Sequence, residues 1–236
     1  MLRRRFLPLA VVVILGVVAA PAGAVRPNTR VVEAAARRDP VLLVHGFRGS
    51  SGGWRALEAS LRAQGYRADE IDAVDYDGGA SNVDVARQLA READALRART
   101  GAARIDVVTH SMGAISSRYW MERLGGAAHV DAWVSLAGVN EGTVWAYGCY
   151  MLAPCRDMVP TSSLLERLNA GFRATGPTRY AAWWSPCDDV IVPHTNAELP
   201  GAHNVETACL DHTQMHDDPQ VLGQVVHFLQ AGGARA

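Results

Sequence analysis

The segment from residue 104 to residue 126 constrains the fold more than any other part of this chain. A β-rich run, residues 104–108, leads straight into Thr109-His110-Ser111-Met112-Gly113. Apolar residues then recur at helical spacing up to Leu124, and a Gly-Gly pair ends that helix. A strand, a sharp turn and a helix in this order predict an α/β fold in which the turn holds Ser111.

The rest of the chain alternates between strand-like and helix-like patterns. A glycine-rich loop, residues 45–53, follows the first continuous apolar run. Because continuous apolar runs suit strands that are buried on both faces, we expect a mostly parallel central sheet with helices on both faces. We expect strands over 40–44, 104–108, 130–137, 180–184 and 205–209. We expect helices over 54–65, 82–100 and 115–124, one more helix that begins after a cap at Ser163, and a last helix that begins at Pro219.

The first 24 residues have the pattern of a secretory signal peptide. Three arginines at positions 3–5 precede an apolar run that ends near Ala20, and Ala22-Gly23-Ala24 forms a small-residue cleavage site. The alternative is a membrane anchor, but the run is shorter than the roughly 20 residues that a span needs, and Pro8 interrupts it. We therefore expect a secreted, extracellular protein with a signal peptide (1–24), a polar lead-in (25–39) and one catalytic domain (40–236).

The net charge and the cysteines limit which partners, cross-links and cofactors can be expected. The expected mature chain has 20 basic and 24 acidic residues, a formal charge of −4, so no nucleic-acid partner is expected. In an exported chain the four cysteines favour two disulfides, for which three connectivities exist. Their spacing does not resemble a zinc site, and there is no phosphate loop, so we expect no metal and no cofactor. The cysteines are Cys149, Cys155, Cys187 and Cys209.

The turn at Ser111 has the pattern of a nucleophile site. A serine hydroxyl is a poor nucleophile until a base takes its proton, so it must stand on a rigid turn that faces an imidazole. The pattern G-x-S-x-G forms such a turn, and here Thr109 replaces its first glycine. The alternative is a surface Ser-Gly turn, which the flanking strand and helix disfavour. The expected oxyanion donors are the backbone amides of Phe47 and Met112, whereas His45 shapes the first loop.

Four short segments resemble the small secreted lipases and esterases (lipase class 2) of the α/β-hydrolase superfamily. They are Val107–Gly113, Val44–Phe47, Trp184–Asp189 and Asp211-His212. The similarity runs from about Pro40 to Leu229. In that family an alanine or glycine usually precedes the His-Ser-Met-Gly segment, so the threonine in this chain departs mildly from the pattern. The resemblance implies the α/β-hydrolase fold and hydrolysis of carboxylic esters, triacylglycerols included.

The superfamily orders its triad as serine, acid and histidine. The family pattern places the catalytic histidine just after the last strand, some seven residues before the closing helix. The resemblance therefore implies His212 as the base. The competing histidines are His194, His203 and His216.

Two neighbouring aspartates are candidates for the acid. Asp188 fits the family's Ser-x-x-Asp spacing from Ser185, whereas Asp189 fits the wider Asp-x-Ile-Val-Pro pattern. We favour Asp188. Its role would be to hold the His212 tautomer and stabilise the imidazolium without taking the proton.

The loop after residue 137 is the candidate substrate pocket. Val139 and Trp145 would form a wall for the acyl chain, and the alternative is local packing beneath a disulfide loop. Residues 139–162 form a short stretch with two cysteines that would pin it, so we expect a minimal lid or none.

We expect Cys149 to pair with Cys155, and Cys187 with Cys209. Cys187 immediately precedes Asp188, and Cys209 lies three residues before His212. The second bridge would therefore tie the acid loop to the base loop. The alternative is a purely structural staple.

The sequence as a whole predicts acyl transfer from an ester or lipid substrate by a Ser-His-Asp triad, through an acyl-enzyme. We expect a monomer that makes transient contact with lipid surfaces. Two alternatives are an acyltransferase on the same scaffold and an exported binding protein without catalysis. The intact Ser111, His212 and aspartate disfavour the binding protein.

Overall fold

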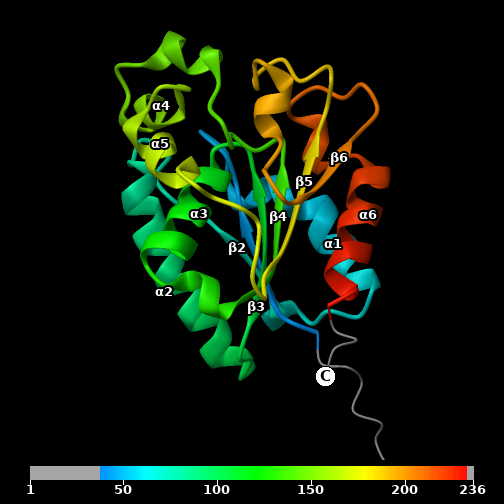
Figure 1. Cartoon of the computed structure of the whole chain (residues 1–236). Helices are drawn as coiled ribbons and strands as arrows, with labels where there is room; N and C mark the ends of the chain where they lie inside the picture. Colours follow the sequence, from blue (N-terminus) through cyan, green and yellow to red (C-terminus); the bar gives the residue numbers. More distant parts are fainter. Residues whose placement is uncertain (1–37, 233–236) are drawn as a thin grey trace, which may run out of the picture. The chain divides into compact units, whose positions relative to one another are not determined.

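The computed structural model describes residues 38–232. The predicted signal peptide (1–24) and most of the predicted lead-in (25–39) lie outside the described residues. Six strands form one parallel sheet in the order β2-β1-β3-β4-β5-β6, which confirms the expected parallel sheet (Figure 1). The strands are β1 (Val41–Val44), β2 (Ile71–Val74), β3 (Ile105–His110), β4 (Val130–Leu136), β5 (Arg179–Trp184) and β6 (His203–Glu206).

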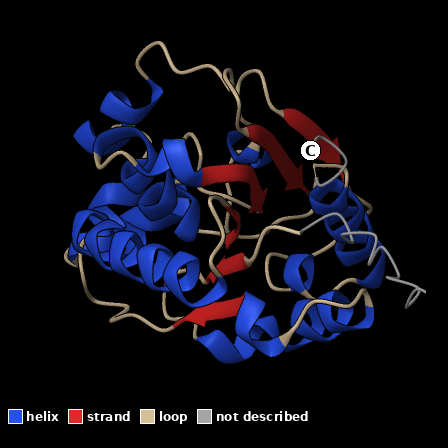
Figure 2. Ribbon diagram, turned by 90° about the horizontal axis from the view of Figure 1, so that it is seen from below, coloured by secondary structure: helices blue, strands red, loops and turns tan. Residues whose placement is uncertain are grey.

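Helices cover both faces of this sheet, as Figures 1 and 2 show. Helices α1 and α6 pack on one face, and α2 and α3 pack on the other. The helices are α1 (Arg55–Ala63), α2 (Asn82–Thr100), α3 (Gly113–Arg123), α4 (Ala153–Met158), α5 (Ser163–Asn169) and α6 (Pro219–Gln230). Among residues 38–232, no helix has the length and hydrophobicity needed to cross a bilayer.

The periodicity of the buried residues explains these layers. In α6 the buried residues Val221, Leu222, Val225, Val226 and Leu229 recur at the spacing of one helical face. In contrast, β1 and β3 are buried along their whole length, because both faces of the sheet are covered. This arrangement leaves the carboxyl ends of the strands to carry the loops that bear the candidate site.

Three of the differences between the expected and observed elements have a clear local cause. The edge strand β2 was not expected, because only Ile71 and Val74 are buried in it and no continuous apolar run marks it. The other edge strand, β6, ends at Glu206 rather than Cys209 and is mostly exposed, so its apolar content does not define it. Helix α5 is capped by Ser162 rather than Ser163, and the Ser162 Oγ accepts from the Leu165 amide at 3.1 Å.

Candidate active site

Ser111 lies on a strained turn between β3 and α3. Its φ angle is +56°, a left-handed conformation that is uncommon for a residue with a side chain. Backbone hydrogen bonds hold the turn from both sides: the Ser111 amide donates to the Leu136 carbonyl at 3.0 Å, and the Val139 amide donates to the Ser111 carbonyl at 3.2 Å. Neighbouring structure therefore fixes a backbone conformation that the serine would rarely adopt alone.

Glycines allow the close packing around this turn. A Cβ atom at Gly113 would lie 2.7 Å from the carbonyl oxygens of Val44 and His45, and one at Gly46 would lie 2.6 Å from the Ser111 Cβ. No side chain fits at either position. Thr109 fits where the family pattern has a small residue, because its Oγ1 donates to the Val134 carbonyl at 3.0 Å inside the sheet.

Ser111, His212 and Asp188 form a continuous chain of hydrogen bonds. The Ser111 Oγ lies 2.8 Å from the His212 Nε2, and the His212 Nδ1 lies 3.0 Å from both carboxylate oxygens of Asp188. A carboxylate only accepts, so the Nδ1 of the neutral ring carries the proton and the Nε2 accepts from the serine. All three residues are buried, with 7% or less of their surface exposed. This arrangement can move a proton from the serine to the imidazole.

The two neighbouring aspartates have different contacts. Asp188 faces the ring of His212, and its Oδ1 also accepts from the Val190 and Ile191 amides at 2.8 Å each. Asp189 does not contact the ring; its Oδ1 accepts from the His212 backbone amide at 3.2 Å. The geometry thus gives Asp188 the position that a triad acid needs, and Asp189 supports the backbone of the base loop.

Two backbone amides flank the serine where an oxyanion would form. Phe47 follows the end of β1, and Met112 follows Ser111 directly. Within residues 38–232 no hydrogen bond uses either amide as a donor. The hydroxyl of Tyr76 donates to the His45 carbonyl and holds this first loop in place. The amides are therefore free to stabilise negative charge on a substrate oxygen.

Two further histidines, His45 and His110, line the same cavity as His212. Burial lowers the pKa of His45, whose Nδ1 donates to the Gly46 carbonyl at 2.8 Å. Burial also lowers the pKa of His110 well below its usual range, and the nearby His212 and His216 lower it further. The sequence assigned no role to His110, although its place directly before the serine was a signal that it would lie at the site.

Two disulfides are present, in the expected pairs. Cys149 pairs with Cys155, and Cys187 pairs with Cys209, with Cα–Cα distances of 5.7 and 5.0 Å. Ser185 makes a second tie beside the latter bridge, because its Oγ donates to the Leu210 carbonyl at 2.6 Å. The loop that carries the aspartates is thus joined to the loop that carries His212 by a disulfide, by the Ser185 hydroxyl, and by the contacts of Asp188 and Asp189 with His212.

The two residues expected to form an acyl wall do not line the cavity that contains Ser111. That cavity has a volume of about 230 Å³ and lies between the loop after β1, the nucleophile turn and the base loop. Val139 is 1% exposed and packs in the core with Met112, because its loop folds back beneath the serine. Trp145 is 44% exposed and stands edge-on to Phe47, with 6.4 Å between ring centroids.

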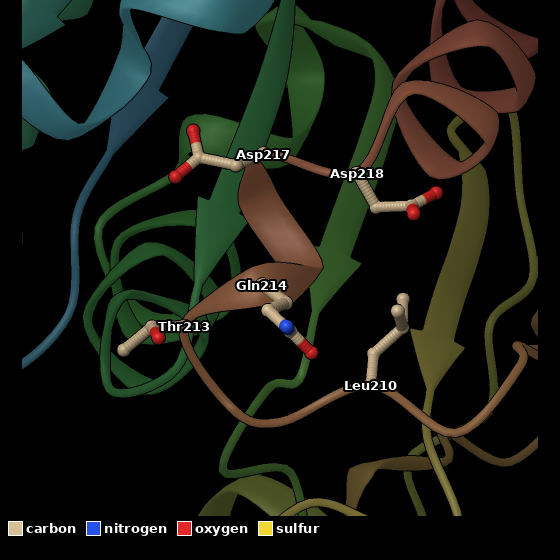
Figure 3. A pocket seen from close by; sticks show the side chains of 5 residues that line it. All are labelled: Leu210, Thr213, Gln214, Asp217 and Asp218. Carbon is tan, nitrogen blue, oxygen red and sulfur yellow. The ribbon is translucent and has the colours of Figure 1, made fainter.

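A second hollow is lined by residues between positions 210 and 218, on both sides of His212 in the sequence. Figure 3 shows the side chains that line it, among them Asp217 and Asp218, whose carboxylates point apart. Asp218 is already engaged, because its Oδ1 accepts from the Gln220 and Val221 amides and caps α6. None of the three triad candidates lines this hollow.

One acidic cluster has the composition of a metal site. The carboxylates of Asp39, Asp106 and Asp131 lie within 4.8 Å of one another near the amino ends of β1, β3 and β4. Asp131 is paired with Arg179 at 2.8 Å and with Arg104 at 3.5 Å. These arginines already supply positive charge to the cluster, which lies at the opposite end of the strands from Ser111.

Comparison with known proteins identifies the family and the fold. The family described as Lipase (class 2) matches residues 38–224. The fold is similar to the mature lipase BlEst2 of Bacillus licheniformis, with a TM-score of 0.72 and 16% identity over 81% of this chain and 92% of that one. It is also similar to Aspergillus fumigatus lipase B (TM-score 0.65, 16% identity, 84% of this chain and 55% of that one).

A third similar structure comes from work on carboxylesterases of the thaumarchaeon Nitrososphaera gargenis. Its TM-score is 0.58 at 16% identity, over 85% of this chain and 92% of that one. At such identities the structural likeness shows the fold alone, which is that of the α/β-hydrolases. The family match covers most of the chain and carries the classification. The chain belongs to the class 2 lipase family and is a carboxylic ester hydrolase.

Proposed function

We propose that the protein cleaves carboxylic esters through an acyl-enzyme, with Ser111 as nucleophile, His212 as base and Asp188 as the acid of the triad. The observation that supports this most directly is the 2.8 Å contact between the Ser111 Oγ and the His212 Nε2. The other ring nitrogen, the His212 Nδ1, contacts the Asp188 carboxylate. A hydroxyl, an imidazole and a carboxylate in this order form the arrangement that activates a serine.

The reaction proceeds in two steps on these residues. In acylation the Ser111 Oγ attacks the ester carbonyl while the His212 Nε2 takes its proton, and the amides of Phe47 and Met112 stabilise the oxyanion. The same nitrogen then gives the proton to the leaving alcohol. In deacylation a water, deprotonated by His212, attacks the acyl-serine and releases the acid and the free Ser111.

Replacing the nucleophile tests this proposal. We expect Ser111→Ala to lower kcat on a soluble butyrate ester by about 10⁶-fold, as the loss of a triad nucleophile does. Ser163→Ala, at an exposed serine that begins α5, is the matched control and should keep full activity. Residual turnover of a few per cent in Ser111→Ala, or an inactive wild-type chain, would contradict the assignment. Adding an alcohol acceptor and measuring the transfer product separates hydrolysis from acyl transfer.

Contact with lipid surfaces is supported by one exposed apolar segment. Residues 144–152 contain six of the seven large apolar side chains that are exposed within residues 38–232; the seventh is Leu124. The segment is uncharged, and its Trp145 contacts Phe47 at the rim of the cavity. Tryptophan and tyrosine suit the boundary between lipid and water. The exposed residues are Val144, Trp145, Tyr147, Tyr150, Met151 and Leu152.

Binding of the protein to lipid vesicles can be measured without ester hydrolysis when each variant also contains Ser111→Ala. Met151 is 88% exposed, and Met151→Glu should weaken binding to neutral phosphatidylcholine vesicles about tenfold or more. Leu124→Glu, on the other exposed apolar side chain, should bind as the parent does. Equal losses in both variants would mean that residues 144–152 do not form the lipid contact. Because the Cys149–Cys155 bridge pins this segment, we expect no sharp rise in activity when a monomeric ester forms droplets.

We further propose export of the protein as a monomer. The sequence predicts a signal peptide (1–24), a lead-in (25–39) and a catalytic domain (40–236), and this proposal keeps those bounds. The two disulfides are consistent with an extracellular protein. The N-terminal sequence of the exported protein should begin at Val25. Sedimentation of that protein should give one species near the mass of a single chain.

A further inference from the structure

We propose that Thr143 is a positioning residue for the triad, and that its hydroxyl holds the loop of Asp188 in the conformation that catalysis needs. The inference rests on the proposed function and deepens it, because it assigns a part in the reaction to a buried residue outside the triad. Three observations support it: the loop lacks regular structure, the Thr143 hydroxyl bonds its backbone, and the same stretch of backbone bonds the Asp188 carboxylate.

The loop that carries Asp188 contains neither helix nor strand. Strand β5 ends at Trp184, and the next regular element, a short 3₁₀ helix, begins at His194. No ladder of hydrogen bonds within a helix or sheet therefore fixes the backbone between them, and groups from other parts of the chain must hold it. The disulfide at Cys187 ties the start of the loop. The part beyond Asp188, residues 190–192, needs an anchor of its own.

The side chain of Thr143 supplies that anchor. The residue is fully buried, so its hydrogen bonds do not compete with bulk water. Its Oγ1 donates to the Val190 carbonyl and accepts from the Val192 amide at 3.2 Å. The backbone adds a parallel contact, because the Val144 amide donates to the Val192 carbonyl at 3.1 Å. One hydroxyl thus holds the loop on both sides of Ile191.

The same stretch of the loop orients the acid. The Oδ1 of Asp188 accepts from the Val190 and Ile191 amides at 2.8 Å each. The same oxygen lies 3.0 Å from the His212 Nδ1. Val190 therefore contacts Asp188 through its amide and Thr143 through its carbonyl. If the loop were released from Thr143, the carboxylate would shift relative to the imidazole, and small displacements of catalytic groups are costly.

A third bond of this hydroxyl reaches the exposed apolar segment, residues 144–152. The Thr143 Oγ1 accepts from the Trp145 amide at 3.2 Å and so caps the short 3₁₀ helix Val144–Cys149. A hydroxyl has one proton to donate and two lone pairs, and all three are used here. Valine has nearly the same shape as threonine but no hydroxyl, so Thr143→Val would remove all three bonds at once.

Variants that separate the hydroxyl of Thr143 from its shape test the inference. Thr143→Val should lower kcat on a soluble butyrate ester about tenfold or more, with KM little changed. Thr143→Ser loses a methyl group but keeps the hydroxyl, so it should retain nearly the wild-type kcat. A higher kcat in Thr143→Val than in Thr143→Ser would mean that shape matters rather than the hydroxyl, and the inference would be wrong.

Thr178→Val is the matched control. Thr178 is also buried, and its Oγ1 donates to the Val130 carbonyl at 2.9 Å, where β4 begins at the far end of the sheet from Ser111. This variant should lower the melting temperature and keep the wild-type kcat.

A double variant shows whether Thr143 acts through the acid. Asp188→Asn has already removed the carboxylate that Thr143 is proposed to position. In that background Thr143→Val should therefore lower kcat far less than it does in the wild-type chain. Equal fold losses in the two backgrounds would mean that Thr143 does not act through Asp188.

The outcomes separate the inference from the proposed function. If Asp188→Asn keeps the wild-type kcat, the assignment of the triad itself fails. If Asp188→Asn is impaired but Thr143→Val keeps its kcat, or Thr178→Val loses as much kcat, the inference is wrong and the triad stands. Should Thr143→Val not fold, as judged by its thermal transition, Thr143→Ala decides in its place, because its small side chain leaves room for water beside the freed backbone groups. It should also lose kcat, and an unchanged kcat would contradict the inference.

Discussion

The ring of His110 donates a hydrogen bond from its Nε2 to the backbone carbonyl of His212, at 2.9 Å. A carbonyl only accepts, so this nitrogen carries the proton. The two rings also pack together, with 4.7 Å between centroids. One side chain therefore joins the turn of the nucleophile to the loop of the base, independently of the contact between Ser111 and His212.

This contact predicts that His110 is a positioning residue. His110→Phe keeps a ring but loses the donor, and we expect kcat to fall about 10- to 100-fold with KM little changed, because small displacements of a base are costly. His110→Gln places an amide nitrogen near the original Nε2 and should recover most of kcat. Kinetics on a soluble ester measure both. A role in packing alone would instead favour His110→Phe over His110→Gln.

The two aspartates should differ sharply when each is replaced by asparagine. Asp188→Asn presents an amide to the His212 Nδ1 and favours the wrong tautomer, so we expect kcat to fall about 10⁴-fold. Asp189→Asn keeps an oxygen acceptor for the His212 amide and should cost less than about tenfold. The reverse ranking would make Asp189 the acid of the triad.

The nucleophile turn could be predicted from the sequence because local chemistry determines it. The strand before Ser111, the helix after it and the small residue at Gly113 are all neighbours along the chain. The mostly parallel sheet followed from the alternation of strand-like and helix-like segments, whereas the order of its strands was not predicted. The choice between Asp188 and Asp189 rested on the resemblance to known lipases, since two adjacent carboxylates have the same local pattern.

The features that were missed depend on contacts between distant parts of the chain. The carbonyl to which His110 donates is 102 residues away, and nothing near His110 in the sequence specifies that partner. Val139 was expected at the surface of a pocket, but it is enclosed because its loop returns beneath Ser111. The Asp39–Asp106–Asp131 cluster unites the starts of three strands, which only the register of the sheet brings together.

Asp106 should make stability depend on pH. Burial, and next the charges of Asp39 and Asp131, raise its pKa well above the usual 3.8. Its contribution to the free energy of unfolding is therefore fully present below the unfolded-state pKa and is lost as pH rises through the folded-state value. Asp106→Asn keeps the acceptor for the Ala132 amide and should raise the melting temperature at pH 8 more than at pH 4.

Thermal unfolding at several pH values measures this effect. Asp94→Asn, on the exposed face of α2, provides the control and should show no such difference. A lower melting temperature for Asp106→Asn at pH 8 would mean that Asp106 is stabilising as an anion.

The bridge between Cys187 and Cys209 should affect turnover as well as stability. It joins residues adjacent to Asp188 and three positions before His212, and closing this loop should stabilise the fold by about 3 kcal/mol in the entropic account. The smaller loop closed by Cys149 and Cys155 should contribute about 2 kcal/mol.

The double variant Cys187→Ala/Cys209→Ala should therefore melt lower than the wild type. It should also lose several-fold in kcat at a temperature where it stays folded, because the acid and base loops are then held only by the hydrogen bonds of Ser185, Asp188 and Asp189. Cys149→Ala/Cys155→Ala is the matched control, with a lower melting temperature and unchanged kcat on a soluble ester. If the first double variant keeps the wild-type kcat while its melting temperature falls, the Cys187–Cys209 bridge is a structural staple only.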